Sequence, residues 1–335
     1  MSARDGAIAA FLAGAGWDDA ERGKLAGDAS FRRYDRLRRG ADSAVLMDAP
    51  PPHEDVRPFL RIARLLERLG LSAPRILAED VEQGLLLLED FGDGTYTRLL
   101  RDGRDERQLY MLAVDLLITL HRRFDIGLAA SVPLYDEARL LTEASLLVDW
   151  YLPAIRGEPT PHPLREEYLA MWRQLLPFAK GAPDSLVLRD FHVDNLMVLP
   201  GREGVDSVGL LDFQDAVIGP VTYDLVSLLE DARRDVDPEL VADMIERYLA
   251  AFPELDADGF ADSYAVLGAQ RNCKIVGIFT RLLVRDGKSQ YLEHIPRVWR
   301  LIEQDVRHAA LAPLGAWLER VIPPEQRRIP GVAPR

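Results

Sequence analysis

One stretch of the sequence decides the fold: Leu188-Arg189-Asp190-Phe191-His192-Val193-Asp194-Asn195, followed further along by Leu211-Asp212-Phe213-Gln214-Asp215. Short apolar runs lie at 196–199 and 207–211, and the Pro, Gly and Asp residues between them are typical of a turn. This pattern predicts an antiparallel hairpin. A third apolar run at 185–188 predicts a strand that leads into the loop before it.

Three polar side chains are expected at one end of this hairpin. In a hairpin the residue before the first strand lies beside the residue after the second, and here these are Asn195 and Asp212. Asp190 enters the same place from the loop that opens the hairpin. Such a set of oxygen donors suits Mg²⁺, which prefers hard ligands and keeps several waters. It also leaves one carboxylate to orient a hydroxyl nucleophile.

The order of these residues resembles the catalytic loop and metal-binding aspartate of kinases, in which Asp-x-x-x-x-Asn precedes an Asp carried by a strand. Asp-x-x-x-x-Asn alone recurs by chance, but strand, loop, hairpin and Asp in this order form a more specific pattern. The alternative is that all three residues only favour turns and caps. We interpret Asp190 as the catalytic residue and Asn195 and Asp212 as metal ligands.

Composition limits the class of protein. The 335 residues suffice for about two domains, with 48% hydrophobic and 28% charged residues, as in ordinary soluble proteins. A net charge of -13 argues against nucleic acid or an anionic membrane as the main partner, although it does not exclude ATP. Cys273 is the single cysteine, which rules out an intrachain disulfide and fits a reducing compartment. No segment has the apolar length to span a bilayer, so we expect a cytoplasmic monomer or weak oligomer.

The N-terminal part of the chain alternates strands with one helix. Apolar residues recur at helical spacing between 55 and 69, and a further helix is expected at 4–15. Strands are expected at 24–26, 32–37, 43–47, 75–78 and 84–88.

The pattern becomes helical after Gly92-Asp93-Gly94. We therefore predict an α+β fold with a small β-rich N-lobe at 1–91, which binds the nucleotide, and a large helical C-lobe at 92–335, which carries the catalytic loop and the substrate site. Clefts large enough for ATP often lie at such boundaries. Helices are expected at 106–124, 137–155, 164–179, 221–233, 238–252, 258–285 and 296–311.

The chain resembles the aminoglycoside phosphotransferase and choline kinase family within the protein-kinase-like fold. The resemblance rests on the order of elements, the catalytic loop, Leu120-His121, and the run at 212–220 that leads to Asp224-Leu225. It extends from about Gly27 to about Arg285. It implies a two-lobed phosphotransferase that uses ATP and Mg²⁺ on a small-molecule alcohol.

Four segments are more narrowly similar to the anomeric sugar kinases of bacterial cell-wall recycling. Those enzymes phosphorylate N-acetylmuramate and N-acetylglucosamine at the C1 hydroxyl. This similarity implies an ATP-dependent sugar kinase in peptidoglycan recycling. The segments are 27–34, 47–51, 87–92 and 189–195.

Two positions depart from the general kinase pattern. Leu188 stands where kinases usually carry His or Tyr, a mainly structural position. The third strand ends at Met47-Asp48, where a phosphate-binding lysine is expected. Either the alignment of this strand is shifted or another cation takes this role, with Lys24, Arg32 and Arg33 as the candidates.

Nucleotide-binding residues are expected at both ends of the N-lobe. Backbone N–H groups at 27–30 can approach phosphates, although the same residues form ordinary turns. Backbone groups at 89–91 would bond the adenine edge, or serve only as a linker. The predicted residues are Gly27, Ser30, Phe31, Arg32, Arg33, Glu89 and Phe91.

The remaining candidates surround the catalytic loop. The resemblance implies that Asp224 braces this loop, although an acidic residue near a helix N-terminus is favourable by itself. Glu54 could pair with a phosphate-binding cation, or it could simply be a favourable acidic residue at a helix N-terminus. Sugar contacts are possible for His192, Asp194, Arg271, Asn272 and Tyr151, each of which could instead belong to the core or surface.

Two other functions stay open at this stage. The acidic balance of the chain mildly favours a kinase for an aminoglycoside, choline or another amino alcohol. The missing lysine at Met47 favours a pseudokinase that binds nucleotide without transfer, but the presence of Asp190, Asn195 and Asp212 opposes it.

Overall fold

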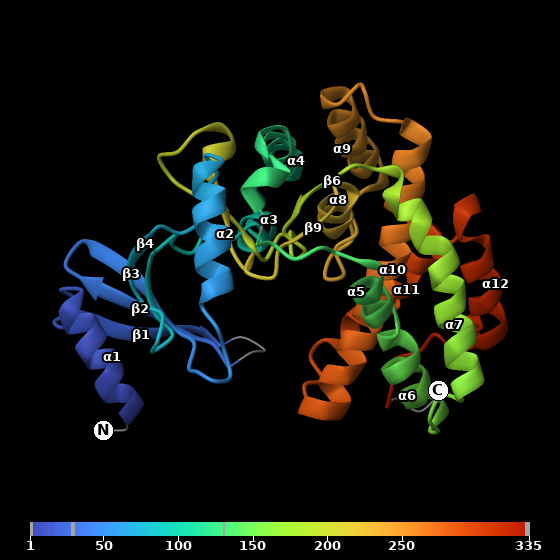
Figure 1. The fold of residues 1–335 in the computed structure, drawn as a ribbon, viewed down its shortest axis with the longest axis horizontal. Helices are drawn as coiled ribbons and strands as arrows, with labels where there is room; N and C mark the ends of the chain where they lie inside the picture. Colours follow the sequence, from blue (N-terminus) through green and yellow to red (C-terminus); the bar gives the residue numbers. More distant parts are fainter. Residues whose placement is uncertain (1–2, 28–30, 130, 332–335) are drawn as a thin grey trace. The chain divides into compact units, whose positions relative to one another are not determined.

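The computed structural model describes residues 3–27, 31–129 and 131–331. The chain forms two compact units (Figure 1). The first unit contains Met1–Leu116 and Val193–Ala216, and the second contains Leu117–His192 and Val217–Arg335. The lobe boundary at residue 91 stays a prediction.

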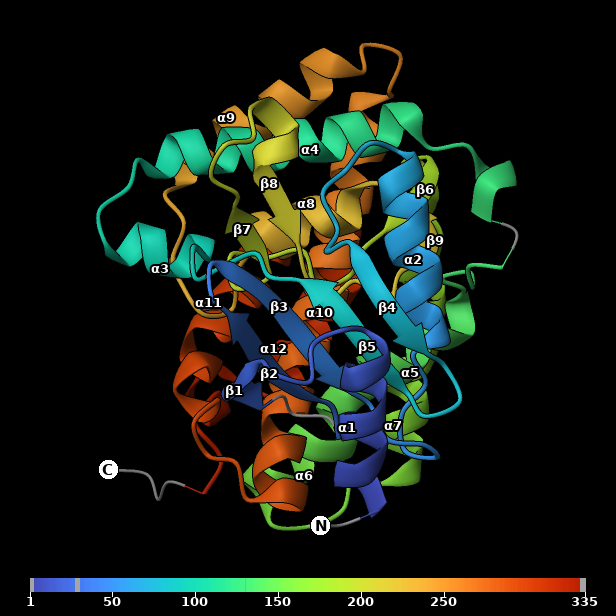
Figure 2. The same cartoon turned by 90° about the vertical axis from the view of Figure 1, so that its left-hand side faces the viewer.

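An antiparallel sheet forms the centre of the first unit. Its five strands lie in the order β1-β2-β3-β5-β4, and Figure 2 looks onto this sheet with α1 in front of it. The predicted strands are confirmed, with β1 longer than expected. The strands are β1 (Glu21–Gly27), β2 (Arg33–Arg39), β3 (Asp42–Asp48), β4 (Ile76–Asp80) and β5 (Leu85–Glu89).

Both faces of the central strands are covered, which explains their continuous apolar sequences. Leu85–Leu88 in β5 are all buried, and so are Ala44–Met47 in β3. Helix α1 (Ala3–Gly14) packs Ile8 and Leu12 on one face. Helix α2 (Arg57–Arg68) lies on the opposite side of the sheet (Figure 1). A strand buried on both faces needs no alternation of polar and apolar residues.

The predicted hairpin is present and belongs to the first unit. It consists of β7 (Leu196–Val198) and β8 (Val208–Leu210), which pair with Leu196 opposite Leu210. The register differs by one residue from the prediction, because Leu211, and not Asp212, lies opposite Asn195 and donates its N–H to the Asn195 carbonyl at 2.9 Å. The strand ends early because the backbone turns at Asp212, where φ is 56°.

Helices form the second unit around the long helix α10 (Ala257–Asp286), most of which is buried. At Gly277 a Cβ atom would lie 2.4 Å from the backbone of Leu146, so only glycine allows this close approach. The other helices are α4 (Glu106–Arg123), which crosses the division between the units, α5 (Glu137–Ala144), α6 (Leu152–Arg156), α7 (His162–Leu175), α8 (Thr222–Leu229), α9 (Pro238–Ala251), α11 (Ile295–Asp305) and α12 (Ala312–Val321).

Some elements differ from the prediction. The helix expected at 137–155 is interrupted by a π-helical turn, η2 (Leu147–Tyr151), and continues as α6. Three elements were not predicted: α3 (Tyr96–Arg101) in the first unit, α12 in the second, and β9 (Val217–Pro220), which pairs with β6 (Asp184–Val187). Short 3-10 segments are η1 (Ile126–Ala129), η3 (Leu176–Gly181), η4 (Gly204–Ser207), η5 (Leu292–His294), η6 (Ala309–Leu311) and η7 (Pro324–Gln326).

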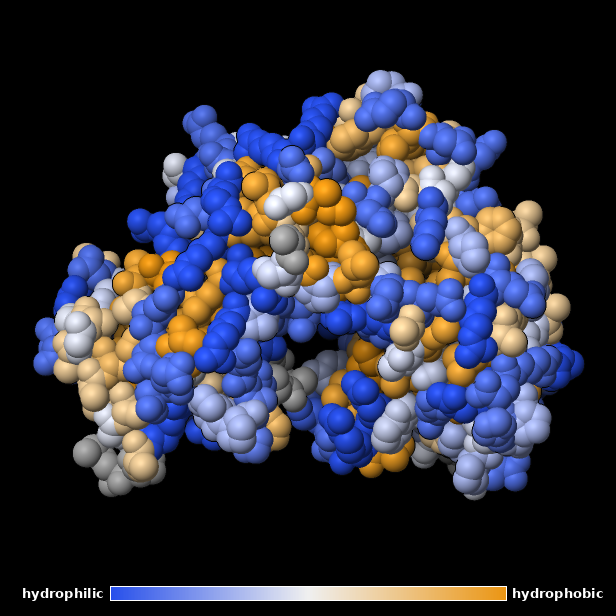
Figure 3. Space-filling view, viewed as in Figure 1, coloured by the Kyte–Doolittle hydropathy of each residue, from blue (hydrophilic) through white to orange (hydrophobic). Residues whose placement is uncertain are grey.

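Hydrophilic side chains and smaller apolar patches share the face seen in Figure 3. Within the described ranges, no helix combines the length and apolar character that a membrane span requires. Cys273 is buried in the core of the second unit, as expected for an apolar role.

Candidate active site

A pocket of about 530 Å³ lies within the first unit. Its walls come from the sheet, from the segment that follows β5, and from the hairpin. The volume is typical of sites that hold a small molecule or cofactor. Four predicted site residues line it together: Glu89, Phe91, Asn195 and Asp212.

Apolar side chains form much of this pocket. Val45 and Leu88 contribute from the sheet, and Met197 from the hairpin. Phe91 lies against β8, where a Cβ on Gly209 would come within 2.8 Å of its ring. Glycine at 209 therefore makes room for Phe91. Flat apolar walls of this kind suit a nucleotide base, and this role stays a prediction.

The segment after β5 is fixed by two arginines that the sequence did not single out. Arg36 on β2 bonds Asp90 at 2.8 Å, Asp93 at 2.8 Å and the Gly92 carbonyl at 2.9 Å. Burial opposes its charge, but the two aspartates raise the pKa of Arg36 overall. Arg202 binds the Glu89 carboxylate at 2.5 Å, so the side chain of Glu89 is already engaged. The Glu89 N–H also donates to the Arg75 carbonyl at 2.9 Å, and the adenine contact at 89–91 stays a prediction.

Asp212 is held by side chains of the same unit. The Gln214 amide donates to Asp212 Oδ1 at 2.8 Å, and Arg32 Nη2 lies 3.8 Å from that oxygen. Arg32 also pairs with Glu54 at 3.6 Å, and Glu54 accepts the Phe31 N–H at 3.0 Å. Glu54 thus pairs with a cation, and the role of that cation in phosphate binding stays a prediction. Of the three candidate cations, Arg32 is the one placed beside the predicted metal aspartate.

The other residues predicted to bind the phosphates have no contact with Asp212 among the contacts described above. Gly27 ends β1, and Ser30 lies outside the described residues. Phe31 is exposed and stacks on His53 with ring centroids 4.8 Å apart. Arg33 and Lys24 are exposed. The nucleotide-binding role of these residues stays a prediction.

The donor chemistry near Asp212 fits Mg²⁺. Asn195 offers an amide oxygen and Asp212 a carboxylate to the same pocket, and hard oxygen donors are the ligands that Mg²⁺ prefers. No group of three or more His, Cys, Asp and Glu side chains gathers for a metal in the described part of the chain. Two protein ligands suit an ion that completes its shell with phosphates and water.

Asp190 belongs to the second unit, in the loop after β6. Asp224 on α8 accepts the N–H groups of Leu188 at 2.6 Å and Arg189 at 2.9 Å. Burial raises the pKa of Asp224 to about 7, although both N–H donors favour its charged form. Asp224 thus binds two N–H groups of the loop, and its part in catalysis stays a prediction. The convergence of Asp190 with Asn195 and Asp212 stays a prediction, because those two belong to the first unit.

His192 and Asp194 have structural partners. Burial lowers the pKa of His192 well below its ordinary value, and Arg233, with Nη1 3.5 Å from Nε2, acts in the same direction. The imidazole is therefore neutral. Asp194 accepts a hydrogen bond from the Thr97 hydroxyl and so ties α3 to the loop. Substrate contact by either residue stays a prediction.

Three other candidate sugar contacts are buried inside the second unit. Arg271 donates to the Ser227 hydroxyl at 3.0 Å, and Asn272 donates to Glu230 at 2.7 Å and to Asp305 at 3.0 Å. The Tyr151 hydroxyl donates to the Arg328 carbonyl at 2.9 Å. These contacts give all three residues structural roles. Their positions lend no support to the predicted sugar contacts, which stay untested.

Comparison with known proteins identifies the family. The model of the phosphotransferase enzyme family matches residues 22–257, and the chain belongs to this family. The predicted class, a small-molecule kinase, is thereby confirmed. Two similar proteins are named N-acetylmuramate/N-acetylglucosamine kinase. The protein from Caulobacter vibrioides is 41% identical over 98% of this chain and 99% of its own length. The protein from Pseudomonas aeruginosa is 40% identical over 90% of each.

Solved structures confirm the protein-kinase-like fold. A choline kinase from Streptococcus pneumoniae has a TM-score of 0.62 at 12% identity, over 92% of this chain and 100% of its own. An aminoglycoside 2'-phosphotransferase in complex with GDP has a TM-score of 0.61 at 14% identity, over 91% and 98%. At such low identity these likenesses bear on the fold alone.

Proposed function

We propose that the chain is an ATP-dependent sugar kinase that phosphorylates the C1 hydroxyl of N-acetylmuramate or N-acetylglucosamine in peptidoglycan recycling. The observation that carries the proposal is the identity of 40–41% with kinases of that name over at least 90% of the chain. The C1 position is our inference from the resemblance of the catalytic and nucleotide-binding segments.

The proposed chemistry divides between the two units. Asp190 accepts the proton of the C1 hydroxyl as its oxygen bonds to the γ-phosphorus of ATP, and the bond from that phosphorus to ADP breaks. Positioning is the main requirement, because phosphoryl transfer needs little covalent help. Asn195 and Asp212 would hold Mg²⁺, which neutralises phosphate charge when bound. The pocket of the first unit would hold the adenine.

Arg32 is the proposed replacement for the missing third-strand lysine. Its guanidinium lies between Glu54 and Asp212, at 3.6 and 3.8 Å. Its charge thus faces the residue expected to carry the metal and the phosphates. Arginine also binds phosphate in a planar, two-pronged geometry that lysine lacks.

We also propose that the enzyme works in the cytoplasm. It depends on ATP, and it has a single cysteine, Cys273, which is buried. Both features suit a reducing compartment that supplies nucleotide.

Identification of the reaction product tests the proposal. The purified chain with Mg²⁺ and ATP is offered N-acetylmuramate, N-acetylglucosamine, a set of aminoglycosides, choline and ethanolamine. We expect ATP consumption with the two amino sugars, and a phosphorus NMR signal coupled to the anomeric proton. A phosphomonoester at C6 would overturn the C1 assignment. Turnover of aminoglycosides or choline alone would replace the sugar by an amino alcohol, and no turnover at all would support a pseudokinase.

A further inference from the structure

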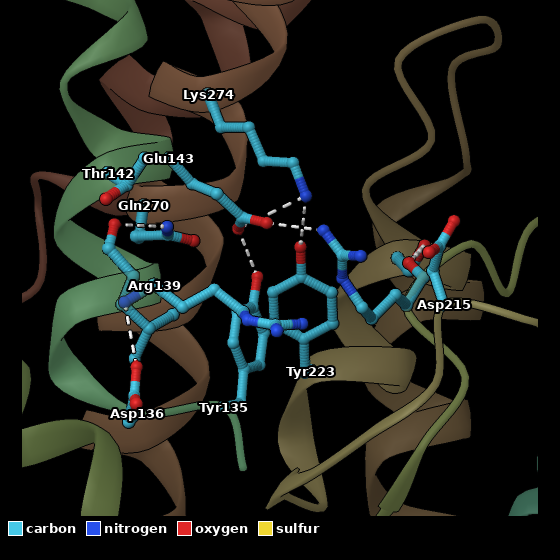
Figure 4. Close-up of polar contacts among 12 residues, drawn as sticks. Tyr135, Asp136, Arg139, Thr142, Glu143, Asp215, Tyr223, Gln270 and Lys274 are labelled. Carbon is cyan, nitrogen blue, oxygen red and sulfur yellow. Dashed lines mark hydrogen bonds and ion pairs between the residues drawn. The ribbon is translucent and has the colours of Figure 1, made fainter. Parts of the chain in front are cut away.

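Glu143 on α5 is a buried carboxylate that receives three partners in the second unit. The Tyr135 hydroxyl donates to it, Lys274 Nζ on α10 lies 3.2 Å away, and the Arg189 guanidinium pairs with it. Figure 4 shows Tyr135 and Lys274 directed at the Glu143 carboxylate from separate elements. Arg189 lies 46 residues beyond Glu143 in the chain, and Lys274 lies further still, so the cluster as a whole was not predicted.

Two cations therefore share one carboxylate. Burial opposes the charge of Glu143, but Lys274 and Arg189 outweigh it and hold the pKa of Glu143 below its ordinary value. Lys274 is also fixed by the Tyr223 hydroxyl at 3.3 Å. Glu143 is thus ionised at neutral pH. Its removal would leave two half-buried cations without their counter-ion, which is a costly arrangement.

The backbone at Arg189 explains what this cluster holds in place. Its φ is 71°, in the left-handed region that residues other than glycine rarely adopt. The Arg189 N–H binds Asp224, its carbonyl accepts the Ser227 hydroxyl at 3.2 Å, and its side chain binds Glu143. Asp190 is the next residue. A change of φ at Arg189 would therefore turn the Asp190 carboxylate away from its place.

We propose that Glu143 is a positioning residue for phosphoryl transfer: it clamps the Arg189 side chain, keeps Arg189 in its left-handed conformation, and so orients the carboxylate of Asp190. The proposal rests on the proposed function in one respect, since it takes Asp190 as the group that accepts the substrate proton. Lys274 and Tyr135 act one step further out, by fixing Glu143.

Glu143→Gln is the first test. A small misplacement of a catalytic group lowers turnover by up to about a hundredfold, so we expect kcat to fall between about tenfold and a hundredfold. The KM for ATP and the equilibrium affinity for ADP should stay within about twofold, because the nucleotide pocket belongs to the first unit. Glu137→Gln is the matched control, since Glu137 is exposed on the same helix, and should behave as wild type.

A second test uses variants of Arg189 to separate a loss of positioning from a loss of stability. Glycine adopts a positive φ without strain, so Arg189→Gly should retain more turnover than Arg189→Ala. In the Arg189→Gly background, Glu143→Gln should change kcat by less than about twofold, because there is no side chain left to clamp. Equal losses in both backgrounds would overturn the proposal, as would wild-type kcat in Glu143→Gln.

Tyr135→Phe covers the case in which Glu143→Gln does not fold. It removes a single hydrogen bond to Glu143 and should lower kcat by about threefold to tenfold with no change in ADP affinity. An unchanged kcat would count against the proposal. Every variant is assayed with whichever acceptor the wild-type chain phosphorylates. A failure to accept sugars would therefore refute the proposed function and leave this test intact.

Discussion

At the scale of single residues, the site is marked by backbone strain. Arg189 and Asp212 are the non-glycine residues with positive φ in the described part of the chain, at 71° and 56°. Arg189 directly precedes the predicted catalytic residue Asp190, and Asp212 is itself a predicted metal ligand. Such conformations cost about 1–3 kcal/mol and persist where the surroundings enforce them, often at functional sites. The contacts of Asp224 and Glu143 enforce the first, and those of Gln214 accompany the second.

Asp190→Asn should lower kcat by about 10²–10⁴ if Asp190 accepts the substrate proton. Nucleotide affinity should change little, because the pocket predicted to hold ATP lies wholly within the first unit. Asp212→Ala gives the contrast, with weaker Mg²⁺-ATP binding as well as lower turnover. Steady-state kinetics and nucleotide titration measure both. Turnover close to wild type in Asp190→Asn would remove its catalytic assignment.

Arg32→Ala should raise the KM for ATP by about tenfold, the effect of losing one charged hydrogen bond to phosphate. Arg68→Ala is the control, because Arg68 is exposed on α2 of the same unit and lies outside the predicted site, and it should leave the KM within about twofold. Initial rates over a range of ATP concentrations distinguish them. Equal effects, or none in Arg32→Ala, would mean that another cation binds the phosphates.

At the scale of elements, the hairpin forms one wall of the pocket that is predicted to hold the nucleotide, and Phe91 lies against it. Gly209 on β8 has no room for a side chain, since a Cβ would meet Phe91 at 2.8 Å and Leu199 at 3.0 Å. The Arg202 guanidinium lies over the Phe91 ring, 5.6 Å from the ring centroid. Phe91 therefore has little freedom to yield.

Gly209→Ala should weaken ADP binding severalfold and cost about 1–3 kcal/mol of stability, the usual range for overpacking. Gly6→Ala on α1 serves as control, because a Cβ there would meet no atom within 4 Å. Isothermal titration and urea unfolding report the two effects. Unchanged ADP affinity in a destabilised Gly209→Ala would show that Phe91 does not form part of the nucleotide site.

A second element-scale feature joins α8, α10 and α11 through two buried carboxyls, Glu230 and Asp305, that share the Asn272 amide. Burial raises the pKa of Glu230 to about 7, and burial together with Glu230 raises that of Asp305 well above its ordinary value. In the unfolded chain both release their protons near pH 4. Between about pH 4 and 7 these two carboxyls therefore hold protons that they would release on unfolding, and the stability that they contribute falls as the pH rises through that window.

Asp305→Asn should flatten this pH dependence, because one of the two carboxyls no longer titrates. We expect the variant to lose less stability than wild type between pH 5 and pH 8. The exposed Asp42 supplies the control, Asp42→Asn. Urea unfolding at both pH values measures the difference. A stability difference between Asp305→Asn and wild type that is the same at both pH values would contradict the raised pKa of Asp305.

The elements also show what local sequence patterns can predict. Strands, most helices and the hairpin follow from periodicity and turn residues, because these signals are local. The π-helical turn at Leu147–Tyr151 was missed, since one extra residue in a turn leaves the apolar pattern almost unchanged. The metal and catalytic candidates were found by spacing. Arg36 and Glu143 were not, because their partners are more than forty residues away in the chain.

At the scale of the whole molecule, net charge is a poor guide to the site. The chain carries a net charge of -13, yet Arg32 stands beside the predicted metal ligand, and Arg189 and Lys274 share one carboxylate behind the catalytic loop. Overall charge affects solubility and encounter with large partners. Recognition of a phosphate or a sugar depends instead on a few local groups.

Selectivity among sugars is the last prediction, and it belongs to the whole enzyme. If the substrate is an N-acetylated hexosamine, the site must supply polar partners for the acetamido group. Those partners would be left unpaired by glucose, and buried unpaired groups are costly. We therefore expect kcat/KM for N-acetylglucosamine to exceed that for glucose by about a hundredfold or more. Glucosamine, which lacks only the acetyl group, is the matched comparison and should resemble glucose. Comparable rates on glucose and N-acetylglucosamine would show that the acetamido group is not recognised, while the assignment as a sugar kinase would stand.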